Sequence, residues 1–363
     1  MSKRPRFFKA VVFFVLVFLC PEVLISNDMN LSIGIVGLPN VGKSTLFKLL
    51  TKKEVLVANY PFATIDPSVG VVAVPDERLK KLTELSSSAK TIPAVVEFYD
   101  IAGLVKGASV GEGLGNQFLS HIRETDAVVQ VVRCFKDPGI IHVDESGVNP
   151  ERDIEIINAE LIFKDLDTVN KRLVSLEKEA RGDAKKLKDV AVIKEIKEGL
   201  EKEILAKNIR DEIADEPVVK ELQLLTAKPQ IYLLNGEESD VSDSLKAKVA
   251  ELKSGYIVYD LAAAEDLGKL IRKAYEILGL ISFFTTGEDE TRAWTIRNGA
   301  KAPEAAGAIH TDFENKFIRA EVIAADKLLE AGSWNTGKQK GWLRLEGKEY
   351  VVADGDVMVI RHG

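Results

Sequence analysis

A glycine-rich loop between an apolar strand and a helix constrains the fold of this chain more than any other feature. Residues 37–45 read GLPNVGKST and match the pattern G-x-x-x-x-G-K-[ST]. The apolar run Leu31 to Val36 precedes the loop, and the pattern predicts a helix that begins near Lys43. Backbone N–H groups of such a loop surround phosphates, and the positive end of the helix attracts them. The sequence therefore predicts an α/β fold with a doubly wound sheet and a phosphate-binding loop after its first strand.

The side chains of this loop have predicted roles at the phosphates. We expect Lys43 to reach the β and γ phosphates and Ser44 to bind Mg²⁺ through its hydroxyl. Asn40 could offer its amide oxygen to a cation beside the phosphates, and K⁺ is a candidate for that ion. A chance glycine loop is the alternative, and the flanking strand and helix argue against it. We assign nucleotide binding in this segment to Asn40, Val41, Gly42, Lys43, Ser44 and Thr45.

Two later segments fall where a nucleotide-dependent switch needs its moving loops. Thr64 lies in NYPFATIDPSVG, and its hydroxyl could complete the Mg²⁺ shell when a γ phosphate is present. A loop Thr that caps its own turn is the alternative for this residue. The β-rich run VVEFYD ends in Asp100, a Walker-B type carboxylate that we expect to act on the metal indirectly. Gly103 has the backbone freedom to bring its N–H to the γ phosphate.

The group that positions the attacking water is not evident from the sequence. Leu104 stands where Ras-like proteins place a Gln, which predicts slow intrinsic turnover. A backbone group, a potassium ion at Asn40, a partner or His142 could orient the water instead. An exposed loop His without such a role is the alternative for His142. The predicted catalytic set for cleavage of the β–γ phosphoanhydride is Lys43, Gly103 and His142.

A polar tetrad at the end of a later strand predicts which base is bound. A guanine reader places Lys and Asp after the Asn, whereas this chain has Asn235, Gly236, Glu237 and Glu238. The Asp of a guanine site accepts hydrogen bonds from N1–H and the 2-amino group, and adenine lacks both donors. Glu238 takes the Asp position with a longer side chain. We assign base binding to Asn235, Gly236 and Glu238, although a polar strand end without a binding role has the same appearance in isolation.

Long motifs show which family the chain resembles. GLPNVGKSTLF, YPFATIDP, DIAGLVKGAS, GEGLGNQFL and IRETDA together resemble the Obg-related P-loop ATPases of the YchF type, called Obg-like ATPase in eukaryotes. The likeness covers everything after Met29. It implies a P-loop NTPase that prefers ATP over GTP through an N-x-x-E base motif, needs Mg²⁺, hydrolyses ATP and has a regulatory association with the ribosome. A GTPase of the Obg type and a nucleotide-gated binding module with negligible hydrolysis are the alternatives.

Changes in composition divide the chain into domains. We assign residues 29–150 and 229–280 to the nucleotide-binding domain and residues 151–228 to an inserted antiparallel helical arm. Residues 281–363 contain short β-type segments with Gly turns and resemble the TGS domain, a β-grasp module. The arm either binds a partner or is a plain packed helix pair. Its apolar residues step by three and four along the chain: Ile154, Ile157, Leu161, Leu166, Val169, Leu173 and Leu176, then Val192, Ile196, Leu200 and Ile204.

Composition and the N-terminal segment limit the cellular setting. A net charge of −7 and a pI near 5.4 argue against binding to nucleic acid through bulk positive charge, and no DNA partner is expected. Cys20 and Cys134 are too few for a disulfide framework, which agrees with a cytoplasmic location. Residues 1–28 order charged and apolar residues as a secretory signal does, but the apolar run is short and no cleavage site follows. We interpret Met29 as the native start, with a targeting segment as the alternative, and we expect membrane association only if that extension belongs to the protein.

Overall fold

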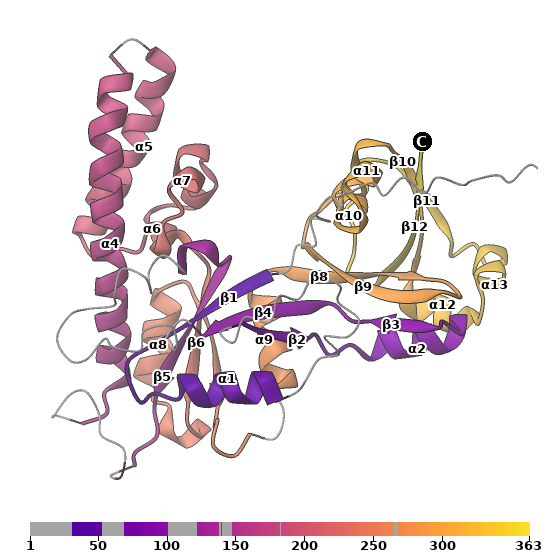
Figure 1. Cartoon of the computed structure of the whole chain (residues 1–363), viewed down its shortest axis with the longest axis horizontal. Coiled ribbons are helices and arrows are strands. Elements are labelled where there is room, and N and C mark those ends of the chain that lie inside the picture. Colours follow the sequence, from indigo (N-terminus) through magenta and orange to yellow (C-terminus); the bar gives the residue numbers. More distant parts are fainter. Residues whose placement is uncertain are drawn as a thin grey trace, which may run out of the picture.

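The computed structural model describes most of the chain after residue 30. The described residues are 31–52, 69–100, 122–137, 139, 147–181, 183–264 and 267–363. Predictions for residues 1–28, Thr64, Gly103, Leu104 and His142 lie outside these ranges. The structure therefore bears on the phosphate-binding loop, the strand that ends in Asp100, the base-side residues, the arm and the C-terminal module (Figure 1).

Within the described residues, six strands form the central sheet in the order β2-β4-β1-β5-β6-β7. β2 is antiparallel to β4, and all the other neighbours are parallel. Every residue of β5 is buried, as expected for an inner strand of a parallel sheet with both faces covered. β1 has the predicted bounds. The strands are β1 Leu31–Val36, β2 Val69–Ala73, β4 Val95–Asp100, β5 Ala127–Arg133, β6 Gln230–Asn235 and β7 Gly255–Tyr259.

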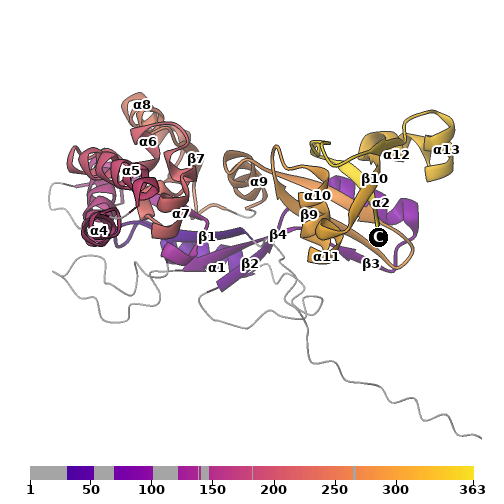
Figure 2. The same ribbon diagram turned by 90° about the horizontal axis from the view of Figure 1, so that it is seen from above.

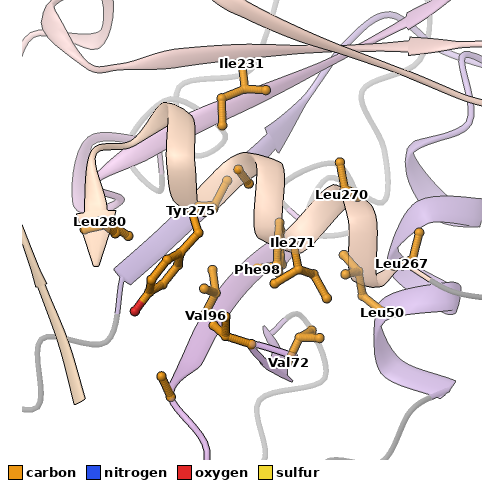
Figure 3. Close-up of a cluster of buried hydrophobic side chains, with 14 of the residues drawn as sticks. Leu50, Val72, Val96, Phe98, Ile231, Leu267, Leu270, Ile271, Tyr275 and Leu280 are labelled. Atoms are coloured by element: carbon orange, nitrogen blue, oxygen red, sulfur yellow. The ribbon is translucent and has the colours of Figure 1, made fainter. Parts of the chain in front are cut away.

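Helices cover both faces of the central sheet, which makes the predicted fold class correct. On one face, Leu50 of α1 and Leu270 and Ile271 of α9 pack with Val96 and Phe98 of β4 (Figure 3). On the other face, apolar side chains of α8 and of the first turns of α4 cover β5 and β6. Apolar stripes at helical spacing are buried here because each helix can stabilise the fold only by covering the sheet. These helices are α1 Lys43–Lys52, α4 Pro150–Glu179, α8 Asp243–Glu251 and α9 Gly268–Ile277.

The predicted arm is a helical hairpin formed by α4 and α5 (Ala184–Glu201). Asn149 caps α4 by accepting a hydrogen bond from Arg152 N, and Pro150 opens the helix without losing an amide donor. The predicted seam is buried along both helices except at Leu166, which is partly buried, and at Ile204, which is 39% exposed. Ile204 leaves the seam because α5 ends at Glu201. The arm and the C-terminal module lie at opposite ends of the molecule (Figures 1 and 2).

A buried carboxylate fastens the base of the arm to the segment that returns to the sheet. Asp165 of α4 accepts hydrogen bonds from Leu225 N at 2.9 Å, Thr226 N at 2.7 Å and Thr226 Oγ1 at 2.7 Å. Burial raises the pKa of Asp165, although the donors from residues 225 and 226 oppose that shift. The returning segment contains α6 Ala206–Ile209, η2 Ile213–Asp215, α7 Pro217–Leu222 and η3 Leu225–Ala227.

The C-terminal module is a second, mixed sheet in the order β11-β10-β12-β8-β9-β3. One face carries α10 and α11, and the other carries α12, α13 and α2. The strands are β3 Lys90–Ile92, β8 Leu280–Thr286, β9 Glu290–Arg297, β10 Phe317–Ala324, β11 Arg344–Glu346 and β12 Asp356–His362. The helices are α2 Glu77–Ser86, α10 Ala302–Ile309, α11 Thr311–Asn315, α12 Ala325–Ala331 and α13 Trp334–Gln339.

The C-terminal sheet is completed by a segment from the first third of the chain, which the sequence did not predict. β3 pairs in parallel with β9, and Ala89 N donates to Glu288 O at 2.8 Å. Leu82 of α2 is fully buried in the core shared with Phe284 of β8. Arg78 of α2 donates to Asp354 at 2.7 Å, so an ion pair also joins the early segment to the C-terminal part of the chain. The strand that ends in Asp100 therefore starts directly from the C-terminal module.

Candidate nucleotide-binding site

The phosphate-binding loop lies where the strand order of the central sheet reverses. The chain leaves β1 at Val36 and enters α1 at Lys43, while β4 and β5 flank β1 on either side. In an open α/β sheet, this point leaves a crevice at the carboxyl ends of the strands. α1 begins at that crevice, and the N–H groups in the first turn of a helix favour an anion. Asn40 to Thr45 are thereby placed at the end of the sheet that binds phosphates in this fold class.

Lys43 is folded over its own loop. Its Nζ donates to Gly37 O at 2.9 Å and to Leu38 O at 2.7 Å, and the residue is 9% exposed. Burial lowers the pKa of Lys43 to about 8, although the negative charge of Asp100 raises it. A phosphate at this position would supply the opposite charge that the buried ammonium needs.

Asp100 and Ser44 are brought to the same edge of the sheet from separate elements. Asp100 ends β4, is paired with Ile35 of β1 and is 8% exposed. Ser44 is the second residue of α1 and is exposed. A hydroxyl and a carboxylate are the oxygen ligands that Mg²⁺ accepts directly or through water, so the two residues fit a magnesium site. Thr64, the third predicted metal residue, lies outside the described residues.

Asn235 connects the phosphate-binding loop to the base side of the crevice. Its Nδ2 donates to Val41 O at 2.9 Å, and its Oδ1 accepts from Leu261 N at 3.1 Å. The residue is 4% exposed at the end of β6. Gly42 has φ +110°, and a Cβ there would lie 2.5 Å from Asn235 Nδ2. A glycine is therefore required by both the backbone and the neighbouring amide. The loop, the Asn and the segment after β7 form one hydrogen-bonded unit.

The residues after Asn235 form a short fixed turn. Glu237 and Asp240 make a reciprocal capping box around η4 (Glu238–Asp240), in which Asp240 Oδ2 accepts from Glu237 N at 2.9 Å. Gly236 fits because a Cβ there would lie 2.9 Å from Asp240 Oδ2. Glu238 is left with its carboxylate outside the capping box, where it accepts from Lys246 Nζ of α8 at 2.7 Å.

Arg133 is a site residue that the sequence did not predict. It is 1% exposed at the end of β5 and is paired with Asn235 of β6. Its guanidinium donates to Phe135 O at 3.2 Å and Asp137 O at 3.0 Å and lies 4.6 Å from the centre of the Phe135 ring. It therefore shapes the chain beside the base-side Asn. The only signal in the sequence was one charge at the end of an otherwise nearly apolar strand.

Within the ranges that the structure describes, no group of three or more His, Cys, Asp or Glu side chains is arranged to hold a metal ion. Among the helices of those same ranges, none has the length and apolar character needed to cross a membrane.

The mostly parallel sheet, the glycine-rich loop at its reversal point and the buried loop lysine define a P-loop NTPase. Within this class the chain belongs to the YchF family, because the "Ribosome-binding ATPase YchF" of Bacillus subtilis (strain 168) is 46% identical over 364 residues. That match covers 92% of this chain and 99% of the relative. The protein of the same name in Escherichia coli O157:H7 is 43% identical over 358 residues, and the match covers 91% of this chain and 98% of the relative.

Family models and a solved structure agree with this assignment. Residues 32–175 match a family described as 50S ribosome-binding GTPase, and residues 280–363 match the YchF GTPase C-terminal family, described as a protein of unknown function. The structure of the Schizosaccharomyces pombe YchF GTPase has a TM-score of 0.80 to this chain at 40% identity. The structural match covers 92% of this chain and 98% of the yeast chain. The predicted family and fold are thus confirmed.

Proposed function

We propose that this protein is an Mg²⁺-dependent ATPase that switches between ATP-bound and ADP-bound states and associates with ribosomes in the cytoplasm. The observation that carries the proposal is the hydrogen-bonded unit formed by Val41, Asn235 and Leu261. It joins Asn235, the first residue of the N-x-x-E segment, to the phosphate-binding loop. A purine whose phosphates lie in the loop would therefore meet Asn235, Gly236 and Glu238 at its base.

The preference for adenine rests on which side chains face the base. A guanine site uses a short acidic side chain that accepts from N1–H and the 2-amino group, and its carboxylate would be unpaired against adenine. Here the corresponding residue is Glu238, whose longer side chain accepts from Lys246 instead. Nothing at this position then requires the donors of guanine. The bacterial relatives are named ATPases, which agrees with this assignment.

The phosphate side supplies binding and charge. Lys43 already places its ammonium over the loop through Gly37 O and Leu38 O, so a nucleotide meets a preorganised cation. Ser44 and Asp100 would hold Mg²⁺, directly or through water, and the bound ion would neutralise charge on the β and γ phosphates. Thr64 and Gly103 are proposed to respond to the γ phosphate, and His142 or a K⁺ ion at Asn40 to orient the attacking water.

The route from the nucleotide to a partner follows the chain. β4 ends in Asp100 at the phosphate side and starts directly from β3 in the C-terminal sheet. The arm is attached through α4, because the first turns of this arm helix pack on β5 and β6. Both parts are thus attached to elements that border the nucleotide site, and we propose that they present its state to the ribosome. The names of the bacterial relatives, which include ribosome binding, support this partner.

Calorimetric titration with ADP and GDP in the presence of Mg²⁺ tests the base assignment without interference from hydrolysis. We expect ADP to bind more tightly than GDP, and Glu238→Asp to reduce that difference by shortening the acidic side chain. Cosedimentation with purified ribosomes in ATP and in ADP tests the partner. Tighter binding of GDP by the unaltered protein would refute the ATP assignment.

A GTPase is the second candidate, because the matched N-terminal family and the fission yeast structure are both described as GTPases. The same titration separates the two candidates. A GTPase should bind GDP at least as tightly as ADP, and Glu238→Asp should then strengthen GDP binding without changing which base is preferred.

A further inference from the structure

We propose that Lys246 is a specificity-determining positioning residue, which acts by holding the Glu238 carboxylate in an ion pair and so keeping it from accepting hydrogen bonds from guanine. The inference rests on the proposed function and explains how a base site with an acidic residue in the guanine-reading position can prefer adenine. Lys246 lies on α8, eight residues after Glu238 in the chain. It has no role in the N-x-x-E motif itself.

The turn that follows Asn235 leaves one carboxylate available. Glu237 caps η4, and Asp240 accepts from the Glu237 amide, so these two acids are committed to the backbone of the turn. The Glu238 carboxylate is the acceptor for Lys246 Nζ at 2.7 Å. Its side chain is 69% exposed, whereas that of Lys246 is 27% exposed and is held against the protein. The position of the carboxylate is therefore set by the lysine.

The chemistry of the two bases makes this pairing selective. A free carboxylate three residues after the Asn can accept from N1–H and the 2-amino group of guanine, whereas adenine offers neither donor. An ion pair that neutralises and orients the Glu238 carboxylate therefore weakens guanine binding. Adenine binding loses nothing, because adenine has no donor for that carboxylate. The lysine that a guanine motif carries next to its Asn is replaced here by Gly236. The cation near the tetrad is instead Lys246, which comes from α8.

Replacing Lys246 tests this inference through a ratio of affinities. Lys246→Met keeps the length of the side chain and removes its charge. Losing a cation near a polyanion weakens ADP and GDP alike, so that effect cancels in the ratio of their Kd values. Release of Glu238 favours GDP alone, and the ratio of Kd for GDP to Kd for ADP should fall about threefold to fivefold, the upper range for an exposed ion pair.

The same helix offers a matched comparison. Lys248 forms an ion pair with Glu155 at 2.7 Å, and its side chain is 32% exposed, close to the value for Lys246. Lys248→Met removes a similar pair that does not involve the tetrad, so the GDP to ADP ratio should stay at the wild-type value. Lys246→Arg keeps the charge and should also preserve the ratio. In a Glu238→Gln background, Lys246→Met should no longer shift it, because the carboxylate is already absent.

The outcomes separate this inference from the proposed function. Wild-type protein that prefers GDP would refute the ATPase proposal, while the effect of Lys246→Met on the ratio would still decide the role of the lysine. Wild-type protein that prefers ADP, together with a Lys246→Met ratio no different from that of Lys248→Met, would overturn the role of Lys246 alone. A shift that persists in the Glu238→Gln background would overturn it too, because the lysine would then not act through Glu238.

Discussion

Replacing Gly42 with alanine should damage both the fold and the nucleotide site. Two costs are expected: about 1–3 kcal/mol for a non-glycine residue at φ +110°, and about 1–3 kcal/mol for crowding. The crowding arises because the new Cβ would lie 2.5 Å from Asn235 Nδ2 and 3.2 Å from a Leu261 methyl. Asn235 cannot move freely, since its amide is bonded to both Val41 and Leu261.

Gly299 provides the comparison that isolates the crowding. It has φ +92°, and a Cβ there would meet nothing within 4 Å, so Gly299→Ala carries the backbone cost alone. Denaturant unfolding should show Gly42→Ala to be less stable than Gly299→Ala by about 1–3 kcal/mol, the crowding contribution. Calorimetry should show weaker ADP binding only for Gly42→Ala. Equal losses of stability, with ADP affinity unchanged in both variants, would refute the proposed contact between the loop and Asn235.

Three further predictions concern charge and packing. Because the pKa of Lys43 is lowered to about 8, most of the Lys43 side chain is neutral at pH 9 and must take up a proton before it can pair with a phosphate of ADP. The Kd for ADP should therefore rise about tenfold from pH 7 to pH 9 in calorimetry. A Lys43→Arg variant, which stays charged, should show no such rise. Leu82→Ala should lower the free energy of unfolding by about 2–5 kcal/mol because Leu82 is fully buried, whereas Leu345→Ala, at a side chain that is 64% exposed, should change it by less than about 0.5 kcal/mol. Asp165→Asn places an amide group against backbone donors and should cost about 1–3 kcal/mol in denaturant unfolding, and equal effects from Asp165→Asn and the exposed Asp167→Asn would contradict the anchoring role.

Local pattern was enough to predict the elements that carry the phosphate side. The apolar run before Gly37 and the glycine-lysine pair define β1 and the start of α1, because a parallel inner strand and a helix N-terminus each have a strong local signature. The helical seam of the arm was predicted for the same reason. The prediction of a buried seam residue was wrong at Ile204, because the apolar spacing continues in the sequence beyond the end of α5 at Glu201.

Contacts between distant segments could not be predicted from the sequence. β3 has three residues, so no periodicity marks it as part of the C-terminal sheet, and its partner β9 lies about two hundred residues away. The ion pair between Glu238 and Lys246 and the two hydrogen bonds of Asn235 depend in the same way on how loops meet. Arg133 was missed because burial of a charge at a strand end becomes visible only when its carbonyl acceptors are placed around it.

The proposed Mg²⁺-dependent ATPase activity can be measured as release of inorganic phosphate from equal concentrations of ATP and GTP, with and without Mg²⁺. We expect a higher kcat/KM for ATP than for GTP, no release without Mg²⁺, and loss of release in a Lys43→Ala variant. Release from GTP at the higher kcat/KM, or release from ATP that is unchanged by Lys43→Ala, would contradict it.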